Sequence, residues 1–122
     1  MYMNKLRLDG RLAVVTGGGR NIGRAIAEAL AEAGARLVLL DRDAAVLEAG
    51  KAELAGKGHT ATGFVVDVVR SGDMQRLADR IAADHGGGDI LVANAGIGCL
   101  PTAAEDVSDQ DWLTMNDVNV NG

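Results

Sequence analysis

The chain has 122 residues, 48% of them apolar, and a net charge of −5. This charge argues against nucleic acid as a partner, because no basic cluster is present to neutralise phosphates. One cysteine excludes an internal disulfide, and no apolar run suits a signal peptide or a membrane span. We therefore expect one domain of a soluble cytoplasmic protein that binds neither membrane nor nucleic acid.

Strand and helix patterns alternate four times along the chain. Short apolar runs bounded by polar or glycine residues predict buried strands. These strands are residues 12–16, 35–40, 60–66 and 89–93. The runs between them have helical periodicity and helix-capping residues. These helices are residues 21–33, Asp43 to about Ala55, Ser71 to about His85, and Ser108 to Gly122. With right-handed crossovers, this order predicts an α/β protein with a doubly wound parallel sheet in three α/β/α layers.

The sequence also predicts which residues of two helices are buried. Helical spacing places the apolar residues of each helix on one face. For the first helix these are Ile22, Ala25, Ile26, Ala29, Leu30 and Ala33, and for the third they are Met74, Leu77, Ala78 and Ile81.

Residues 16–23, Thr-Gly-Gly-Gly-Arg-Asn-Ile-Gly, join the first strand to the first helix. Backbone N–H groups at a helix start are unpaired and lie at the positive end of the helix dipole, so they attract an anion. Glycines allow a tight turn and let phosphate oxygens approach the backbone. The stretch therefore predicts a pyrophosphate site, although its spelling is T-G-x-x-x-N-x-G rather than G-x-G-x-x-G.

Other polar residues follow the remaining strands. Asp41 ends the second strand, where a carboxylate can accept hydrogen bonds from ribose hydroxyls and repel a 2′-phosphate. This favours NAD, but NADP remains open because Arg20 or Arg42 can reach a 2′-phosphate. Asp67, beside Val68, can accept a hydrogen bond from the adenine amino group, although a plain strand-end aspartate explains it equally well. No cluster has metal-ligand spacing, so we expect no metal.

Together these residues resemble the N-terminal half of a single-domain short-chain dehydrogenase/reductase. The resemblance runs over residues 8–122 and includes the 16–23 turn, the strand-end aspartates, Asn94-Ala95-Gly96 and the run at 117–122. It departs at Asn21, where the family usually has glycine, and at Ala93, where it often has a second asparagine. Asparagine tolerates the left-handed conformation better than other side chains, so we expect the turn to survive.

The resemblance implies a Rossmann-type NAD(P)-binding domain with a defined set of cofactor-binding residues. These are Gly17, Gly19, Arg20, Asn21, Ile22, Gly23, Asp41, Arg42, Asp67, Val68, Asn94, Ala95 and Gly96. It also implies that Asn119 is a catalytic residue, which supports a water and the catalytic lysine in a proton relay. Without the resemblance, Asn94-Ala95-Gly96 is an ordinary turn and Asn119 is a neutral helix residue or a kink.

The implied activity is hydride transfer between a nicotinamide cofactor and a secondary alcohol or ketone, such as a polyol, a sugar or a 3-oxoacyl substrate, by a homotetramer. The family's reaction uses a serine and a Tyr-x-x-x-Lys pair, whereas the only tyrosine here is Tyr2, three residues before Lys5. We therefore expect residues 1–122 to be the N-terminal part of a longer domain, with a sheet that is incomplete on its C-terminal side. The alternative is a dinucleotide-binding fragment without catalysis.

Overall fold

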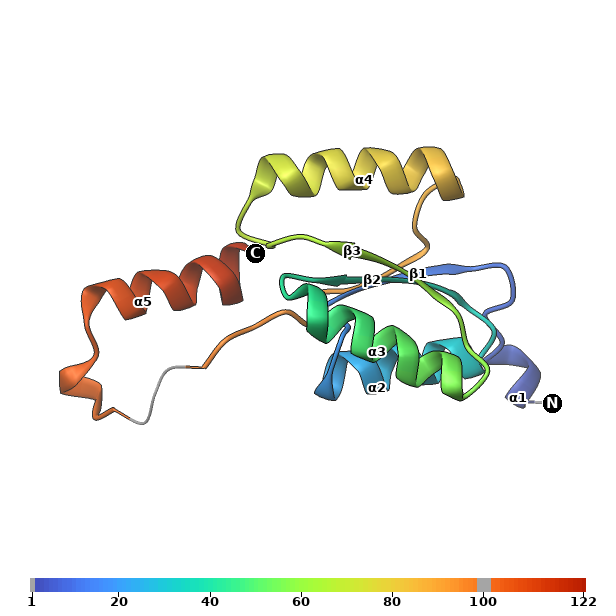
Figure 1. The fold of residues 1–122 in the computed structure, drawn as a ribbon, viewed down its shortest axis with the longest axis horizontal. Helices are drawn as coiled ribbons and strands as arrows, with labels where there is room; N and C mark the ends of the chain where they lie inside the picture. The colour runs from blue at the N-terminus through green and yellow to red at the C-terminus, as the bar shows by residue number, and fades with distance from the viewer. Residues whose placement is uncertain (1, 99–101) are drawn as a thin grey trace.

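The computed structural model describes residues 2–98 and 102–122, which form a parallel sheet with helices on both faces (Figure 1). The strands are β1 (Leu12–Thr16), β2 (Arg36–Asp41), β3 (Ala61–Val65) and β4 (Ile90–Val92). The α-helices are α1 (Tyr2–Lys5), α2 (Asn21–Glu32), α3 (Ala44–Gly56), α4 (Ser71–His85) and α5 (Asp109–Asn116). A 3₁₀ turn, η1 (Ala104–Asp106), precedes α5, and a π-helical turn, η2 (Asp117–Asn121), follows it.

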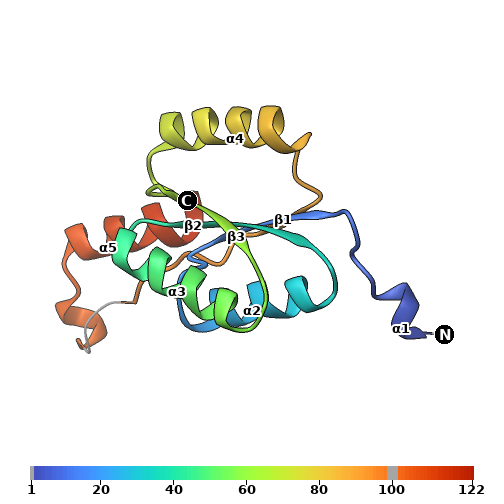
Figure 2. The ribbon, with the colours of Figure 1, turned by 45° about the vertical axis from the view of Figure 1, so that its right-hand side comes forward.

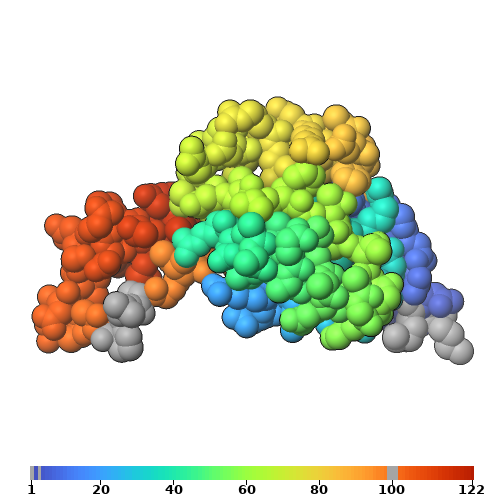
Figure 3. All heavy atoms as spheres, viewed as in Figure 1, coloured from blue at the N-terminus to red at the C-terminus, as the bar shows by residue number. Residues whose placement is uncertain are grey.

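The strand order is β3-β2-β1-β4, with every pair parallel. Helices α2 and α3 cover one face and α4 covers the other in both ribbon views (Figures 1 and 2), so the expected doubly wound α/β/α fold is confirmed. The chain moves outward from β1 to β3 and then crosses back to β4, so the strand order reverses between β1 and β4. The α5 segment projects beyond the strand ends (Figure 1) and forms a lobe at one side of the molecule in the space-filling view (Figure 3).

The core is built on β1 and β2, whose side chains alternate between the two faces. On one face, Val15 and Leu39 pack with Leu47 of α3, and on the other, Val38 packs in the cluster that contains Ile81 of α4. Each of these strands has a neighbour on both sides, so their residues are buried in near-continuous runs. At β4, in contrast, Leu91 is 69% exposed.

The predicted buried face of α2 is only partly confirmed, because Leu30 packs against the core and Ile26 and Ala33 are half-buried, but the other three residues are exposed. Ile22 is 70% exposed, and Ala25 and Ala29 are also exposed, whereas Gly23 and Ala27 face the sheet. The reason is close approach: a Cβ on Gly23 would lie 2.1 Å from the carbonyl oxygen of Gly17. The helix therefore turns its smallest residues toward the strand, and a count of apolar residues cannot reveal this.

The predicted helix starts are partly confirmed. Asp43 caps α3 by accepting hydrogen bonds from the N–H groups of Ala45 and Val46, and Ser108 caps α5 by accepting one from Asp111. Ser71 is the first residue of α4 and does not cap it, because Arg70 holds the cap position.

Ala78 of α4 is exposed, which corrects its predicted burial. In the described residues, no helix combines the length and apolar character that a membrane crossing requires.

Asp89 ties the start of β4 to the start of β1. Its carboxylate accepts hydrogen bonds from the Leu12 N–H group and from Arg11, both at 2.8 Å. These bonds, the Leu12 bond first, lower the pKa of Asp89 from its ordinary value of 3.8. A carboxyl group whose pKa is lowered on folding stabilises the protein above its unfolded pKa, and this stabilisation is lost as the pH falls through its folded pKa.

We expect Asp89→Asn to lower the free energy of unfolding at neutral pH, because the charge-assisted bonds are lost. The difference from the wild type should begin to shrink as the pH falls below about 4, where Asp89 of the unfolded chain is protonated, and should disappear below the lowered pKa of the folded state. Urea unfolding at several pH values measures both effects. Asp84→Asn is the control, because Asp84 forms an exposed ion pair with Arg80 on the same helix, α4, at 3.5 Å. Equal destabilisation by the two variants at all pH values would contradict this account.

Candidate functional site

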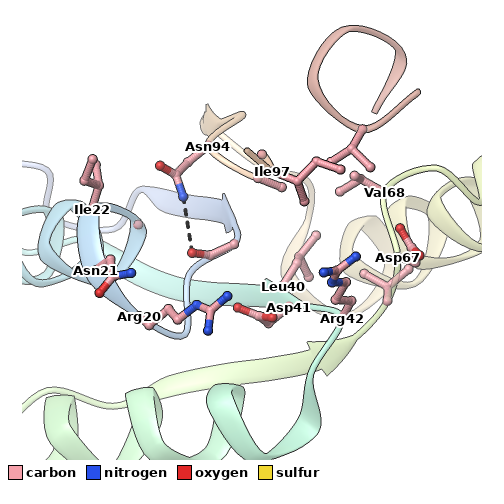
Figure 4. Close-up of a pocket in the computed structure, with 16 residues that line it drawn as sticks. Arg20, Asn21, Ile22, Leu40, Asp41, Arg42, Asp67, Val68, Asn94 and Ile97 are labelled. Carbon is pink, nitrogen blue, oxygen red and sulfur yellow. Dashed lines mark hydrogen bonds between the residues drawn. The ribbon is translucent and has the colours of Figure 1, made fainter. Parts of the chain in front are cut away.

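A cleft of about 270 Å³ opens at the carboxyl ends of the strands, where the strand order reverses (Figure 4). Its lining comes from the glycine-rich turn, from the segments that follow β2, β3 and β4, and from the C-terminal turn. These residues are Gly17, Arg20, Asn21, Ile22, Gly23, Leu40, Asp41, Arg42, Val66, Asp67, Val68, Asn94, Ala95, Gly96, Ile97 and Val118. The cleft thus brings together every residue expected to bind a cofactor except Gly19.

The glycine-rich turn places an open helix start on the cleft. Gly17 has a φ of 61° and Asn21 has a φ of 48°, and Asn21 is the only non-glycine residue with a positive φ in the described part of the chain. Asparagine thus supplies the left-handed conformation here, as expected. Among the described residues, no side chain caps the start of α2, in contrast to α3 and α5. The first N–H groups of α2 are therefore available to an anion.

Gly19 lies behind the cleft, against α3. A Cβ at this position would lie 2.8 Å from the carbonyl oxygen of Val46. Its N–H group donates to the Asp41 carboxylate at 3.2 Å. Gly19 therefore serves the packing of the turn and does not line the cleft, and its expected part in cofactor binding stays a prediction.

Asp41 is half-buried, and backbone groups hold it in place. Its second carboxylate oxygen accepts a hydrogen bond from the N–H group of Asp43 at 3.1 Å. Each carboxylate oxygen keeps a further lone pair for a ligand hydroxyl. The side chains of Arg20 and Arg42 lie on either side of Asp41 (Figure 4), and both are exposed.

The wall after β3 combines one carboxylate with apolar side chains. The Asp67 carboxylate accepts a hydrogen bond from the N–H group of Val69 at 3.3 Å, as in an ordinary turn. Leu40, Val66 and Val118 line the cleft beside it, and none of the three was predicted from the sequence as a site residue. Leu40 and Val66 were detectable, because each directly precedes a strand-end aspartate.

Thr16 joins the two strands that flank the reversal. Only 6% of this residue is exposed, and its hydroxyl oxygen accepts hydrogen bonds from the N–H groups of Asn94 and Ala95, both at 3.0 Å. The Asn94 amide in turn donates to the carbonyl oxygens of Thr16 and Gly17, at 3.1 and 3.2 Å. Asn94 therefore fixes the glycine-rich turn relative to the loop after β4.

Asn119 connects the C-terminal turn to the same loop. Its side-chain oxygen accepts the Ile97 N–H at 2.8 Å, and its amide nitrogen donates to the Ile97 carbonyl at 2.9 Å. Both ends of the side-chain amide are thus used on one residue. Asn119 lies in the π-helical turn η2, which the sequence analysis did not foresee beyond a possible kink.

A protein-family comparison matches residues 11–122 to the family described as short chain dehydrogenase. The chain belongs to this family. It is 47% identical over 121 residues to a galactitol 2-dehydrogenase of Rhizobium johnstonii, covering 99% of this chain and 47% of the relative. It is 43% identical over 116 residues to a D-threitol dehydrogenase of Mycolicibacterium smegmatis, covering 95% of this chain and 44% of the relative. The chain thus spans about half the length of the short-chain dehydrogenases that it matches.

Solved short-chain dehydrogenase structures have the same fold over these residues. A metagenomic short-chain oxidoreductase in complex with NADP matches with a TM-score of 0.85 at 37% identity, covering 93% of this chain and 52% of that one. An NAD+-bound xylitol dehydrogenase matches with a TM-score of 0.87 at 34% identity, covering 93% and 44%.

The residues present fit a dinucleotide of the kind these neighbours bind. An uncapped helix start beside glycines suits a pyrophosphate. The carboxylates of Asp41 and Asp67 suit hydroxyl and amino donors, and the apolar wall suits a base.

The Thr16 contact gives a direct test of how this short-chain dehydrogenase holds its cleft. Thr16→Val keeps the side-chain shape but leaves the N–H groups of Asn94 and Ala95 without their acceptor. We expect a loss of about 1–3 kcal/mol in the free energy of unfolding. Thr16→Ser, which retains the hydroxyl, should lose less. Denaturant unfolding compares the two, and equal losses would show that the methyl group matters rather than the hydroxyl.

The positive φ of Asn21 gives a second test. Asn21→Ala should destabilise the protein by roughly 1 kcal/mol, because alanine resists the left-handed conformation, whereas Asn21→Gly should be at least as stable as the wild type. Arg20→Ala is the control, because Arg20 has an extended backbone. Thermal unfolding that ranks Asn21→Ala level with Asn21→Gly would contradict the conformational requirement.

Proposed function

We propose that this chain carries the dinucleotide site of an NAD(P)-dependent oxidoreductase that transfers hydride between nicotinamide and a secondary alcohol of a polyol. The observation that carries the proposal is the cleft, which unites an uncapped helix start, a strand-end carboxylate and an apolar wall. Family membership supports it, and the names of the two sequence relatives favour a polyol over a 3-oxoacyl substrate.

In this proposal the turn binds the pyrophosphate. Asn21, Ile22 and Gly23 line the cleft and form the uncapped first turn of α2, so their N–H groups bind the phosphate oxygens, and Gly17 leaves room for them. Arg20 adds a positive charge at the mouth of the cleft, where it is exposed.

The adenosine end lies beyond β2 and β3. Asp41 accepts hydrogen bonds from the ribose hydroxyls, Asp67 accepts one from the adenine amino group, and the base lies against Val68 and its apolar neighbours. We propose NAD as the preferred cofactor, because the fixed carboxylate of Asp41 repels a 2′-phosphate. Arg42 is the residue that would favour NADP.

The nicotinamide end lies beside β4. The bound nicotinamide supplies the hydride acceptor or donor. Asn94, Ala95 and Gly96 line this end of the cleft, and their small side chains admit the second ribose. Asn119 positions this loop through its two hydrogen bonds to Ile97, and its part in a proton relay stays a prediction.

The cofactor preference is testable with Asp41→Asn. The amide keeps one oxygen acceptor but removes the negative charge, so the ratio of NADP to NAD dissociation constants should fall about tenfold. Calorimetric titration of the complete protein with each cofactor measures this ratio. Asp79→Asn is the control, because it removes the same charge from the exposed face of α4. An unchanged ratio in Asp41→Asn would remove Asp41 from the cofactor assignment.

The activity itself is tested with the complete protein, NAD or NADP, and a panel of galactitol, D-threitol, xylitol and a 3-hydroxyacyl thioester. We expect reduced nicotinamide to form with at least one polyol. Turnover with the thioester alone would overturn the polyol assignment. Binding of cofactor without any turnover would favour a dinucleotide-binding protein that does not transfer hydride.

A further inference from the structure

Gly50, at the middle of α3, packs directly against the glycine-rich turn. A Cβ on Gly50 would lie 2.3 Å from the carbonyl oxygen of Gly19 and 2.8 Å from its Cα. Val46 lies one helical turn before Gly50, and its carbonyl oxygen would lie 2.8 Å from a Cβ on Gly19. The turn and the helix thus meet backbone to backbone, with Gly19 lying over Val46 and Gly50.

This contact is linked to the carboxylate that faces the cleft. Gly19 donates its N–H to one oxygen of Asp41, and Asp43 donates its N–H to the other. The side chain of Asp43 then caps α3 by accepting from the N–H of Val46, which lies under Gly19. The turn, the end of β2 and the start of α3 therefore fix one another in a closed ring of contacts.

Helix α3 cannot easily yield if the contact is crowded. Leu47 and Leu54 anchor it in the core, each with 1% of its surface exposed. Ion pairs also tie it to α2: the Lys57 ammonium lies 2.6 Å from the Glu28 carboxylate, and Arg24 pairs with Glu53. A side chain at position 50 would therefore displace the glycine-rich turn rather than the helix.

We propose that Gly50 is a positioning residue for cofactor binding. By allowing α3 to pack closely against Gly19, it keeps the glycine-rich turn and the Asp41 carboxylate where they can bind a dinucleotide. This rests on the proposed function. In the free protein the turn can move away from a larger side chain at position 50. A bound pyrophosphate requires the turn in its original position, so the larger side chain weakens cofactor binding. Asn94 holds the start of the turn through Thr16 and Gly17, whereas Gly50 crowds it at Gly19. We therefore expect the loop after β4 to keep its place, so that hydride transfer at saturating cofactor is spared.

The test compares Gly50→Ala with Gly56→Ala in the complete protein. Both variants add one methyl group to α3, but a Cβ at Gly56 has no atom within 4 Å. Calorimetric titration should show NAD binding about tenfold weaker in Gly50→Ala, with the KM for NAD raised and kcat retained. Gly56→Ala should bind NAD as the wild type does and melt at a slightly higher temperature, because alanine favours the helix.

Val46→Ala keeps the test decisive if Gly50→Ala does not fold. It removes methyl groups beside Gly19 without crowding, so the turn loses support and NAD binding should weaken by a few-fold. Weaker binding in a folded Gly50→Ala, or in Val46→Ala where Gly50→Ala is unfolded, supports the proposal if Gly56→Ala is unchanged. Wild-type affinity in a folded Gly50→Ala, or in Val46→Ala where Gly50→Ala is unfolded, overturns it. A wild-type protein that binds neither NAD nor NADP overturns the proposed function instead.

Discussion

The structure depends on how closely backbone can approach backbone around β1. Gly23 brings α2 against Gly17, and Gly50 brings α3 against Gly19, so the helices on one face hold both ends of the turn. Ala27, with none of its surface exposed, continues the same close packing along α2. Because these contacts lack side chains, the turn has no soft layer beneath it. The helices therefore set the shape of the turn, and the turn shapes the cleft that it lines.

Polar contacts complete what the glycines begin. Thr16 and Asn94 join the loops on the two sides of the strand reversal, and Asp41 joins the turn to β2. In each case a side chain satisfies backbone groups that the end of a strand leaves open. The cleft is thus preorganised by residues that spend most of their hydrogen-bonding capacity on the protein, while free lone pairs and free helix N–H groups remain for a ligand.

The fold and most of the cleft could be predicted from the sequence, because both follow from local patterns of apolar and polar residues. Buried runs such as residues 12–16 predict a parallel strand, and polar residues that follow such runs must meet at one edge of the sheet. The predicted face of α2 was partly wrong, because hydrophobicity favours burial of Ile22, whereas the close approach to β1 requires the glycine at position 23. The packing contacts of Gly19 and Gly50 were not predicted, for a related reason. A glycine in the sequence does not indicate which distant segment of backbone packs against it.

The same geometry explains how a turn with an unusual spelling can serve a cofactor site. Asn21 adopts the left-handed conformation that glycine would supply, so the departure from the family pattern costs conformational energy at one residue only. The anion-binding N–H groups follow that residue, and the contacts that hold the turn lie on Gly17, Gly19 and Gly23. Position 21 is therefore free to vary within the limits of a positive φ, whereas the glycines under the turn are constrained by atoms on the neighbouring elements.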